Sequence, residues 1–432
     1  MKIFLSIFFF ILSFNSLKAE NNLIFYLESA YKNNPKLNAE RQSLNATKEN
    51  INISKSEFLP SISIDGEINS IDSSNRTNQS GSTLSDLNNE KISKTLSIDQ
   101  KVFQGFQGYN SLKKSQLEVK KADYKLKQVE QEVILDSVSA YFDLIYKIDS
   151  KKFNLANIDI FERQVETDSA RLQRGEITLT DLAQSESTLA GAKAKYITSS
   201  TELLTTTTNF KRIIGLNAPE ANIEQKFIFN SNLPSNLVNA LQLSNKNNPN
   251  LISARLNYEI SKKEVNIEKA QLSPKASINY SKSKIDNFSS TIDKTNQESL
   301  KATIKWPIIS GGKNYSSLKK SRYKEGQSNL ILIDVTNKIK TETTNVWSLF
   351  QSAGSILTST QAQVKAAEIA NEGITLEYDS GDSRTTLDVI QSRSLLLEAR
   401  IANARAKRDF MISKFKLLFV TGNLTLTNLK NS

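Results

Sequence analysis

The sequence predicts an α+β membrane protein built from an internal repeat, with four β-strands and two long helical hairpins in each chain. Three observations predict this class: the repeat, paired strands with one apolar and one polar face, and long segments with a helical pattern. The 432 residues are 38% hydrophobic. That fraction is too low for a bundle of membrane-spanning helices and too high for a disordered chain.

The first residues have the layout of a cleaved secretory signal. Lys2 precedes an apolar run at residues 3–14, and Ala19 precedes the hydrophilic chain that follows. We expect residues 1–19 to be removed on export, which leaves a mature protein without a transmembrane helix. An amino-terminal membrane anchor is the alternative, and the shortness of the apolar run argues against it.

The chain contains an internal repeat. Asn33-Asn34-Pro35 returns as Asn247-Asn248-Pro249 at an offset of 214 residues, and Asp181 returns as Asp388 at an offset of 207. Matches in the same order along both halves indicate one structural unit used twice, with a shorter loop in the second half. We divide the chain into a signal at 1–19, a first repeat at 20–215, a linker at 216–245, a second repeat at 246–422 and a short tail at 423–432.

Each repeat begins with a helix and continues with two strands. In the first repeat Asn34 caps a helix at residues 35–57. Apolar and polar residues alternate after Pro60, a polar loop follows at 70–90, and the alternation then resumes. The second repeat shows the same pattern after Pro274. Strands of about ten residues with this alternation suit a membrane barrel, and a soluble β-sandwich hairpin is the alternative.

A long helical hairpin follows each pair of strands. Residues 109–174 contain neither Gly nor Pro, and as one helix they would extend for roughly 100 Å. Apolar residues step by three and four from Val119 to Val133, which is the seam of a coiled coil. Gly175 ends this helix, and Thr180-Asp181 cap a return helix to about residue 214. The second repeat has a long helix at 313–380, a turn at Gly381 and a return helix at 386–420.

The strands predict an oligomer. Open sheet edges are unfavourable in hydrocarbon because no water satisfies their N–H and C=O groups. Four strands are too few to close a barrel, for which about eight are the practical minimum. Two chains would supply eight strands and a filled lumen, whereas three would supply twelve strands and an open channel. We favour three chains, with their long helices continuing the barrel as an α-helical tube.

Composition excludes most enzymatic chemistry. The sequence has no Cys and no His, so thiolate metal sites, cysteine nucleophiles and the commonest general base are absent. We expect no enzyme activity, no metal and no cofactor. The formal net charge is +11, and two of these charges, Lys2 and Lys18, leave with the signal. Because export removes the setting for nucleic acid, we expect no nucleic-acid partner. A periplasmic coiled-coil adaptor or a structural protein remains the alternative to a channel.

The chain resembles the TolC family of outer-membrane efflux and secretion channels, over residues 20 to about 429. The resemblance is carried by Glu20-Asn21-Asn22-Leu23, Asn33-Asn34-Pro35, Leu59-Pro60, Ala140-Tyr141-Phe142 and the hairpins at 171–181 and 378–391. It implies a homotrimer in the outer membrane of a Gram-negative bacterium that extends into the periplasm. The implied partners are outer-membrane lipid, a periplasmic adaptor protein, and an inner-membrane RND or ABC transporter. The implied role is drug efflux or type I protein secretion.

The resemblance also implies a gate at the periplasmic tips of the helices. The positions that match the family's gate network are Tyr378, Arg384, Asp181 and Gln164. Asp388 matches the first of two acidic rings that constrict the pore, and Gln391 stands at the second. One extra residue between Gly381 and Asp388 alters the spacing around Arg384. Alternatively, Asp181 and Asp388 cap the return helices.

Two further surfaces are expected. The resemblance implies that adaptors dock at the hairpin turns, Arg174-Gly175-Glu176 and Ser380-Gly381-Asp382. Aromatic residues gather at the level where the strands meet the helices, as in the girdle of a membrane barrel, although buried packing at the junction is the alternative. These residues are Phe103, Phe106, Tyr109, Trp306 and Tyr315.

Overall fold

The computed structural model describes residues 23–219, 233–289, 292–380 and 384–430, so the predicted signal at 1–19 lies outside the described residues. The first half of the chain contains α1 (Leu23–Asn33), α2 (Pro35–Ser56), β1 (Ser61–Ser73), β2 (Leu87–Phe103), α3 (Gln107–Gln173) and α4 (Leu179–Ile214). The second half contains α5 (Leu237–Asn247), α6 (Pro249–Ala270), β3 (Lys275–Asp286), β4 (Lys294–Lys305), α7 (Lys313–Asp379) and α8 (Thr386–Val420), followed by α9 (Leu426–Lys430). The same order of elements in both halves confirms the repeat. Helix α5 starts inside the segment that we expected to be a linker, 216–245.

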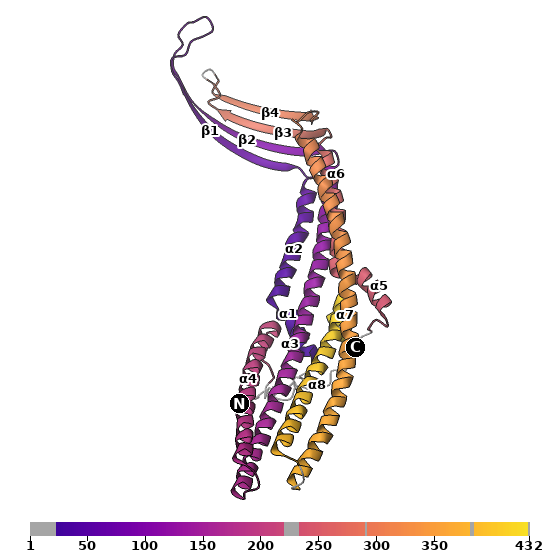
Figure 1. The fold of residues 1–432 in the computed structure, drawn as a ribbon. Coiled ribbons are helices and arrows are strands. Elements are labelled where there is room, and N and C mark those ends of the chain that lie inside the picture. The colour runs from indigo at the N-terminus through magenta and orange to yellow at the C-terminus, as the bar shows by residue number, and fades with distance from the viewer. Residues whose placement is uncertain (1–22, 220–232, 290–291, 381–383, 431–432) are drawn as a thin grey trace, which may run out of the picture.

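The molecule is elongated, with the sheet at one end and the tips of both helical hairpins at the other (Figure 1). Helices α3 and α7 each contain 67 residues, and α3 pairs with α4 while α7 pairs with α8. The coiled-coil seam is confirmed where Val129 and Val133 are only 3% and 2% exposed. Of the helices in the described part of the chain, none combines the length and the apolar character needed to cross a membrane.

The four strands form one antiparallel sheet in the order β1-β2-β3-β4. They contain 12 to 17 residues and are therefore longer than expected. The register aligns Ile62 with Ile98, Ile98 with Tyr280, and Tyr280 with Leu300. One face of the sheet thus carries a row of large apolar side chains, while the outer edges of β1 and β4 have no partner strand among the residues that the structure describes.

The repeated Asn-Pro pairs tie distant helices together. Asn34 accepts hydrogen bonds from the first backbone N–H groups of α2, as predicted for a cap, and Asn248 does the same for α6. The amide of Asn34 also donates to the carbonyl of Ile213 at 3.2 Å, and the amide of Asn248 donates to that of Val420 at 2.9 Å. Each asparagine therefore caps one helix and satisfies a carbonyl at the end of the return helix.

The largest core cluster lies at mid-height, where α1 packs on α3 and α4. Tyr26 of α1 contacts Phe210 edge-on, with ring centroids 5.2 Å apart, and Tyr141 at 5.8 Å. Phe210 and Phe415 are fully buried and Tyr141 is 1% exposed. The cluster joins α1, at the start of the described residues, to the long helix α8. Helix α1 was not predicted from the sequence, although its buried residues Leu23, Leu27 and Ala30 are spaced as one helical face.

Candidate functional site

The candidate site lies at the end of the molecule farthest from the sheet, where α3 turns into α4 and α7 turns into α8 (Figure 1). Gly175 ends the first turn with a φ of +73°, a left-handed conformation that glycine adopts without strain. Arg174, Gly175, Glu176 and Ser380 are exposed. Gly381 and Asp382, also predicted to be docking residues, lie outside the described residues.

Both return helices begin with a capping box. The backbone N–H of Thr178 donates to Asp181 Oδ2 at 2.9 Å, and the N–H of Asp181 donates back to Thr178 Oγ1 at 3.3 Å. Thr385 and Asp388 repeat the arrangement at 2.8 and 3.2 Å. The N-cap residue is therefore a threonine in both helices, Thr178 for α4 and Thr385 for α8. For α4 this differs from the predicted cap at Thr180-Asp181. These hydrogen bonds from threonine hold the pKa of both carboxyls below its ordinary value.

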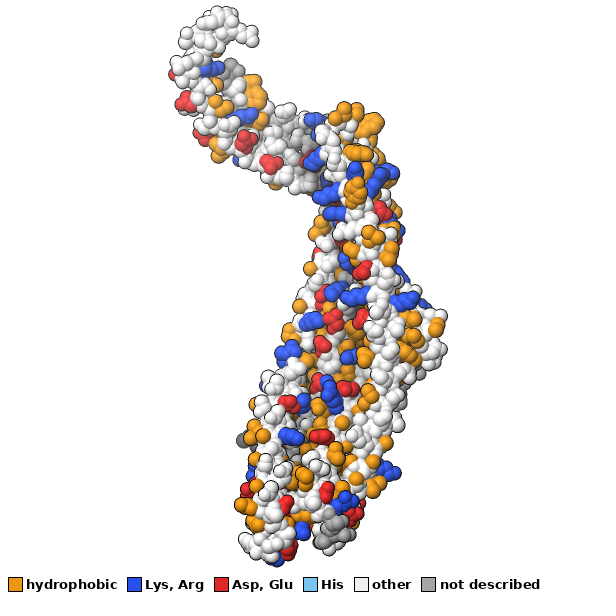
Figure 2. Space-filling view, in the orientation of Figure 1, with side chains coloured by type: hydrophobic (Ala, Val, Ile, Leu, Met, Phe, Trp, Pro, Cys, Tyr) orange, Lys and Arg blue, Asp and Glu red, His pale blue; other side chains and the backbone are white. Residues whose placement is uncertain are grey.

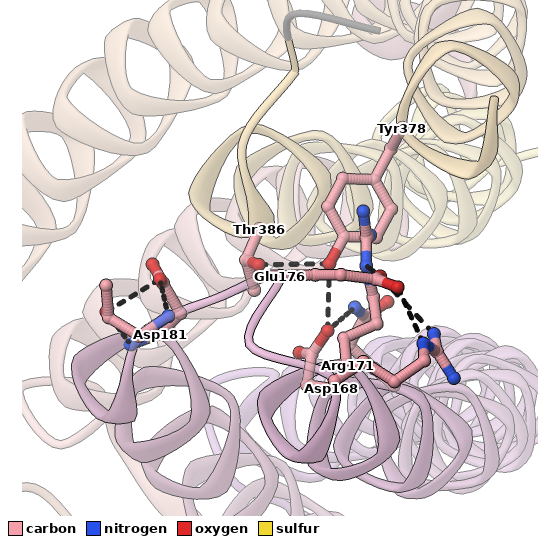
Figure 3. Close-up of polar contacts among 9 residues, drawn as sticks. Asp168, Arg171, Glu176, Asp181, Tyr378 and Thr386 are labelled. Carbon is pink, nitrogen blue, oxygen red and sulfur yellow. Dashed lines mark hydrogen bonds and ion pairs between the residues drawn. The ribbon is translucent and has the colours of Figure 1, made fainter. Parts of the chain in front are cut away.

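A buried carboxylate joins three of the four helices. Asp168 of α3 is fully buried. Its Oδ1 accepts hydrogen bonds from Gln164 Nε2 at 2.9 Å and from the phenol of Tyr378 at 2.8 Å, and its Oδ2 accepts one from Ser185 Oγ at 2.5 Å. Figure 3 shows Tyr378 of α7 pointing at Asp168. Hydrogen bonds of this kind replace the hydration that a carboxylate loses on burial.

The fourth helix joins through two contacts. The hydroxyl of Thr386 in α8 lies 3.0 Å from the phenol oxygen of Tyr378, and Arg393 Nη1 donates to Gln164 Oε1 at 2.7 Å. Burial lowers the pKa of the Arg393 guanidinium, and the charges of Asp379 and Asp168 oppose this effect. We call Gln164, Asp168, Ser185, Tyr378, Thr386 and Arg393 the tip cluster.

Electrostatics favour Tyr378 as a hydrogen-bond donor. Burial is the main cause of the raised pKa of its phenol, and Asp168 adds to it by hydrogen bonding and by its charge. The guanidinium of Arg171 lies 4.4 Å from the centre of the Tyr378 ring. Arg171 and Arg174 both contact Glu176, at 3.1 and 2.6 Å. These contacts connect the buried cluster to the exposed turn.

The structure brings together only part of the predicted gate network. Tyr378 and Gln164 both belong to the tip cluster, whereas Asp181 lies apart from them in its capping box (Figure 3). Arg384 pairs with Glu377 of its own hairpin at 2.5 Å, and both side chains are exposed. Asp388 is half-buried and Gln391 exposed, in the first turns of α8.

Sequence reasoning missed Asp168, which is the centre of the cluster. A signal was present, because Phe161, Gln164 and Asp168 recur at intervals of three and four on the buried face of α3. An acidic residue on such a face needs partners, and two hydroxyls and an amide supply them here.

The predicted girdle residues lie where the sheet meets the helices. Their exposed fractions range from 40% for Phe103 to 69% for Phe106 and Tyr315, so none of the five side chains is buried by this one chain, and the girdle stays a prediction. The Trp306 indole donates to the carbonyl of Leu272 at 3.1 Å. That contact leaves the ring face exposed at the junction, where an aromatic girdle would meet lipid.

Comparisons with known proteins agree with this architecture. A model of the family described as outer membrane efflux protein matches residues 26–216 and 240–423. The outer membrane efflux protein BepC of Brucella suis biovar 1 (strain 1330) is 25% identical over 93% of this chain and 86% of its own length. The outer membrane protein TolC of Escherichia coli (strain K12) is 23% identical over 95% and 84%. Among solved structures, the Campylobacter jejuni CmeC outer membrane channel superposes with a TM-score of 0.82, at 15% identity, over 94% of this chain and 86% of that one.

Proposed function

Because the chain belongs to the outer membrane efflux protein family, we propose that it is a passive conduit from the periplasm to the exterior of a Gram-negative cell, used for drug efflux or type I protein secretion. The observation that carries this function is the combination of a sheet with one apolar face and a buried, hydrogen-bonded tip cluster at the opposite end. An apolar outer face suits lipid, and a closed tip suits a conduit that opens on demand.

The unpartnered edges of β1 and β4 support a homotrimer. In hydrocarbon these edges would leave backbone groups without hydrogen bonds. Pairing β4 of one copy with β1 of the next satisfies both edges, and three copies give a twelve-stranded barrel whose lumen stays open. The exposed aromatic residues at the base of the sheet would then meet outer-membrane lipid.

The exposed turns support docking of a periplasmic adaptor that links the conduit to an RND or ABC transporter. Arg174 and Glu176 pair with each other at 2.6 Å and present charge at the tip. Such rim charges set specificity and association rate more than affinity. The exposed Arg384–Glu377 pair is of the same kind, and exposed pairs contribute only about 0–1 kcal/mol.

We assign closure of the tip mainly to the tip cluster. Its hydrogen bonds connect α3, α4, α7 and α8, so the hairpins cannot separate without breaking bonds to a buried carboxylate. Hydrogen bonds to charged groups contribute about 1.5–3 kcal/mol each. Opening then requires a partner that favours the separated arrangement by a comparable free energy.

The function is tested by extraction and conductance. We expect the full-length protein to require detergent for extraction, to run as a heat-labile trimer band, and to produce stepwise currents in planar bilayers. Extraction as a monomer without detergent, with no current steps, would instead support the periplasmic adaptor or structural protein.

The predicted constriction gives a second test. Three copies of Asp388 around the axis would form an anionic ring, which binds multivalent cations. Lanthanum added on the tip side is expected to block the current, and Asp388→Asn should raise the half-blocking concentration about tenfold. The matched control is Asp379→Asn, which removes the same charge at the same tip.

The block should not change between pH 7 and pH 5. Hydrogen bonds from Thr385 lower the pKa of Asp388. A carboxyl with a lowered pKa keeps its charge, and the stability of its capping box, until the pH falls below about 4. Equal loss of block in both variants would contradict the ring.

A further inference from the structure

The polar face of the sheet carries an uneven distribution of charge. In the middle of this face the register aligns Ser63 with Ser97, Ser97 with Ser281, and Ser281 with Ser299, which makes a row of hydroxyls across all four strands. Side chains two residues apart on a strand share a face. The residues next to the helices on this same face can therefore be read from the register.

Four lysines lie on the polar face beside the helices, and we call them the lysine belt: Lys101, Lys275, Lys301 and Lys305. Lys101 lies four residues after Ser97 on β2, and Lys301 lies two residues after Ser299 on β4, so both share the face of the hydroxyl row. Lys275 and Lys305 are directly opposite each other on β3 and β4. Figure 2 shows basic side chains gathered where the sheet meets the helices.

Little negative charge offsets the belt. The nearest carboxylate on this face, Asp99, accepts a hydrogen bond from Asn279 at 2.7 Å. Within the described residues none of the four ammonium groups forms an ion pair. The other acidic residues of the polar face, Asp65 and Glu67, lie farther from the helices on β1. Like charges directly opposite each other destabilise a sheet, so the Lys275–Lys305 pair is unfavourable for the fold itself.

Side chains from the helices position part of the belt. Lys275 Nζ donates to Gln271 Oε1 at 2.6 Å, and Gln271 Nε2 donates to Gln107 Oε1 at 3.0 Å. Neutral amides therefore orient the ammonium group without neutralising it. The other three lysines are exposed, so their charges are available to solutes that pass this face.

We propose that the lysine belt lines the base of the barrel lumen and gives the conduit a preference for anionic solutes over cationic ones. This inference rests on the proposed function, since the apolar face must meet lipid and the polar face then lines the lumen. Three copies would place twelve ammonium groups in a band three rows deep. Their field reaches about 10 Å at 0.1 M salt and about 30 Å at 0.01 M, so the preference should strengthen as salt is lowered.

The test compares matched lysine variants of the full-length protein. The belt variant carries Lys101→Gln, Lys301→Gln and Lys305→Gln. The control carries Lys94→Gln, Lys284→Gln and Lys294→Gln, which removes the same charge from the same sheet on the apolar face. Both are made together with Asp388→Asn, so that the tip ring does not contribute. The zero-current potential across a KCl gradient in a bilayer of uncharged lipid measures the chloride-to-potassium permeability ratio.

We expect the belt variant to lower this ratio about threefold or more at 0.01 M salt and less at 1 M, where the field reaches only about 3 Å. The control should leave the ratio unchanged. An unchanged ratio in the belt variant, or an equal fall in the control, would overturn the lysine belt while leaving the channel in place. Absence of current from the unmodified protein would overturn the proposed function, and this inference with it.

Discussion

Replacing Asp168 with alanine is expected to shift the channel from a closed, low-conductance state to an open one. Asp168 accepts hydrogen bonds from Gln164, Ser185 and Tyr378, and the last two belong to other helices. Loss of one bond to a charged acceptor removes about 1.5–3 kcal/mol, which changes the closed-to-open ratio by roughly 10-fold to 100-fold. Single-channel recording of the open probability measures the shift.

The matched comparison is Asp181→Ala at the same tip. Asp181 stabilises the start of α4 through its capping box with Thr178. Its loss should therefore fray the first turn of α4 without opening the channel. If Asp181→Ala opens the channel and Asp168→Ala does not, Asp181 is a gate residue, as the family resemblance implies, and the tip cluster does not hold the channel closed.

Tyr378→Phe tests the same bond from the other side. It should raise the open probability less than Asp168→Ala does, because Gln164 and Ser185 still donate to the carboxylate. The double variant should show less than the sum of the two effects, since both substitutions remove the same hydrogen bond.

The raised pKa of Tyr378 keeps the phenol protonated at least to about pH 10. The contribution of its O–H is therefore present at neutral pH and is lost only in strong alkali.

Gly422→Ala is expected to destabilise the fold far more than Gly215→Ala, although the two glycines are repeat counterparts. Both follow return helices, with φ values of +73° and +81°. An alanine in this conformation costs about 1–2 kcal/mol at either site. At Gly422 an added Cβ would also lie 2.3 Å from the carbonyl oxygen of Asn247, whereas at Gly215 the nearest atom is 3.9 Å away. Overpacking adds about 1–3 kcal/mol at Gly422 alone.

Denaturant unfolding of the purified protein in detergent, followed by circular dichroism, measures both changes in the free energy of unfolding. The structure predicts a loss of about 2–5 kcal/mol for Gly422→Ala against about 1–2 kcal/mol for Gly215→Ala. Equal losses would mean that the contact between the end of α8 and the α5–α6 junction relaxes freely.

Much of the fold could be predicted because its signals are local. Alternation after Pro60 and Pro274 marks strands wherever one face is apolar, and the run without Gly or Pro at 109–174 leaves a helix uninterrupted. Helix starts at Pro35 and Pro249 follow from an asparagine cap and a proline in the first turn. These features depend on residues within a few positions of one another.

The site was less predictable because its contacts are distant in sequence. Asp168 and Tyr378 are separated by 210 residues, and neither position carries a motif that names its partner. The second hydrogen bond of each capping asparagine, to Ile213 or Val420, is equally remote. The family resemblance placed Tyr378 and Gln164 in the gate network at the tip, and both belong to the tip cluster. It also placed Asp181 in that network, whereas the structure shows Asp181 in a capping box. The sequence alone could not distinguish these two roles for Asp181.

By itself, the sequence determined the repeat, the helix and strand types, and the excess of basic residues, since composition and periodicity express them directly. Only the tertiary structure decided which carboxylate is buried at the tip and which lysines share the polar face. The physical reason is that burial and register are properties of packed neighbours. The aspartate on α3 can connect the helices at the tip only because Ser185 and Tyr378 donate the hydrogen bonds that water would otherwise supply to its carboxylate. A lysine joins the belt only where strand pairing sets it beside Lys275 or Lys305 on the polar face.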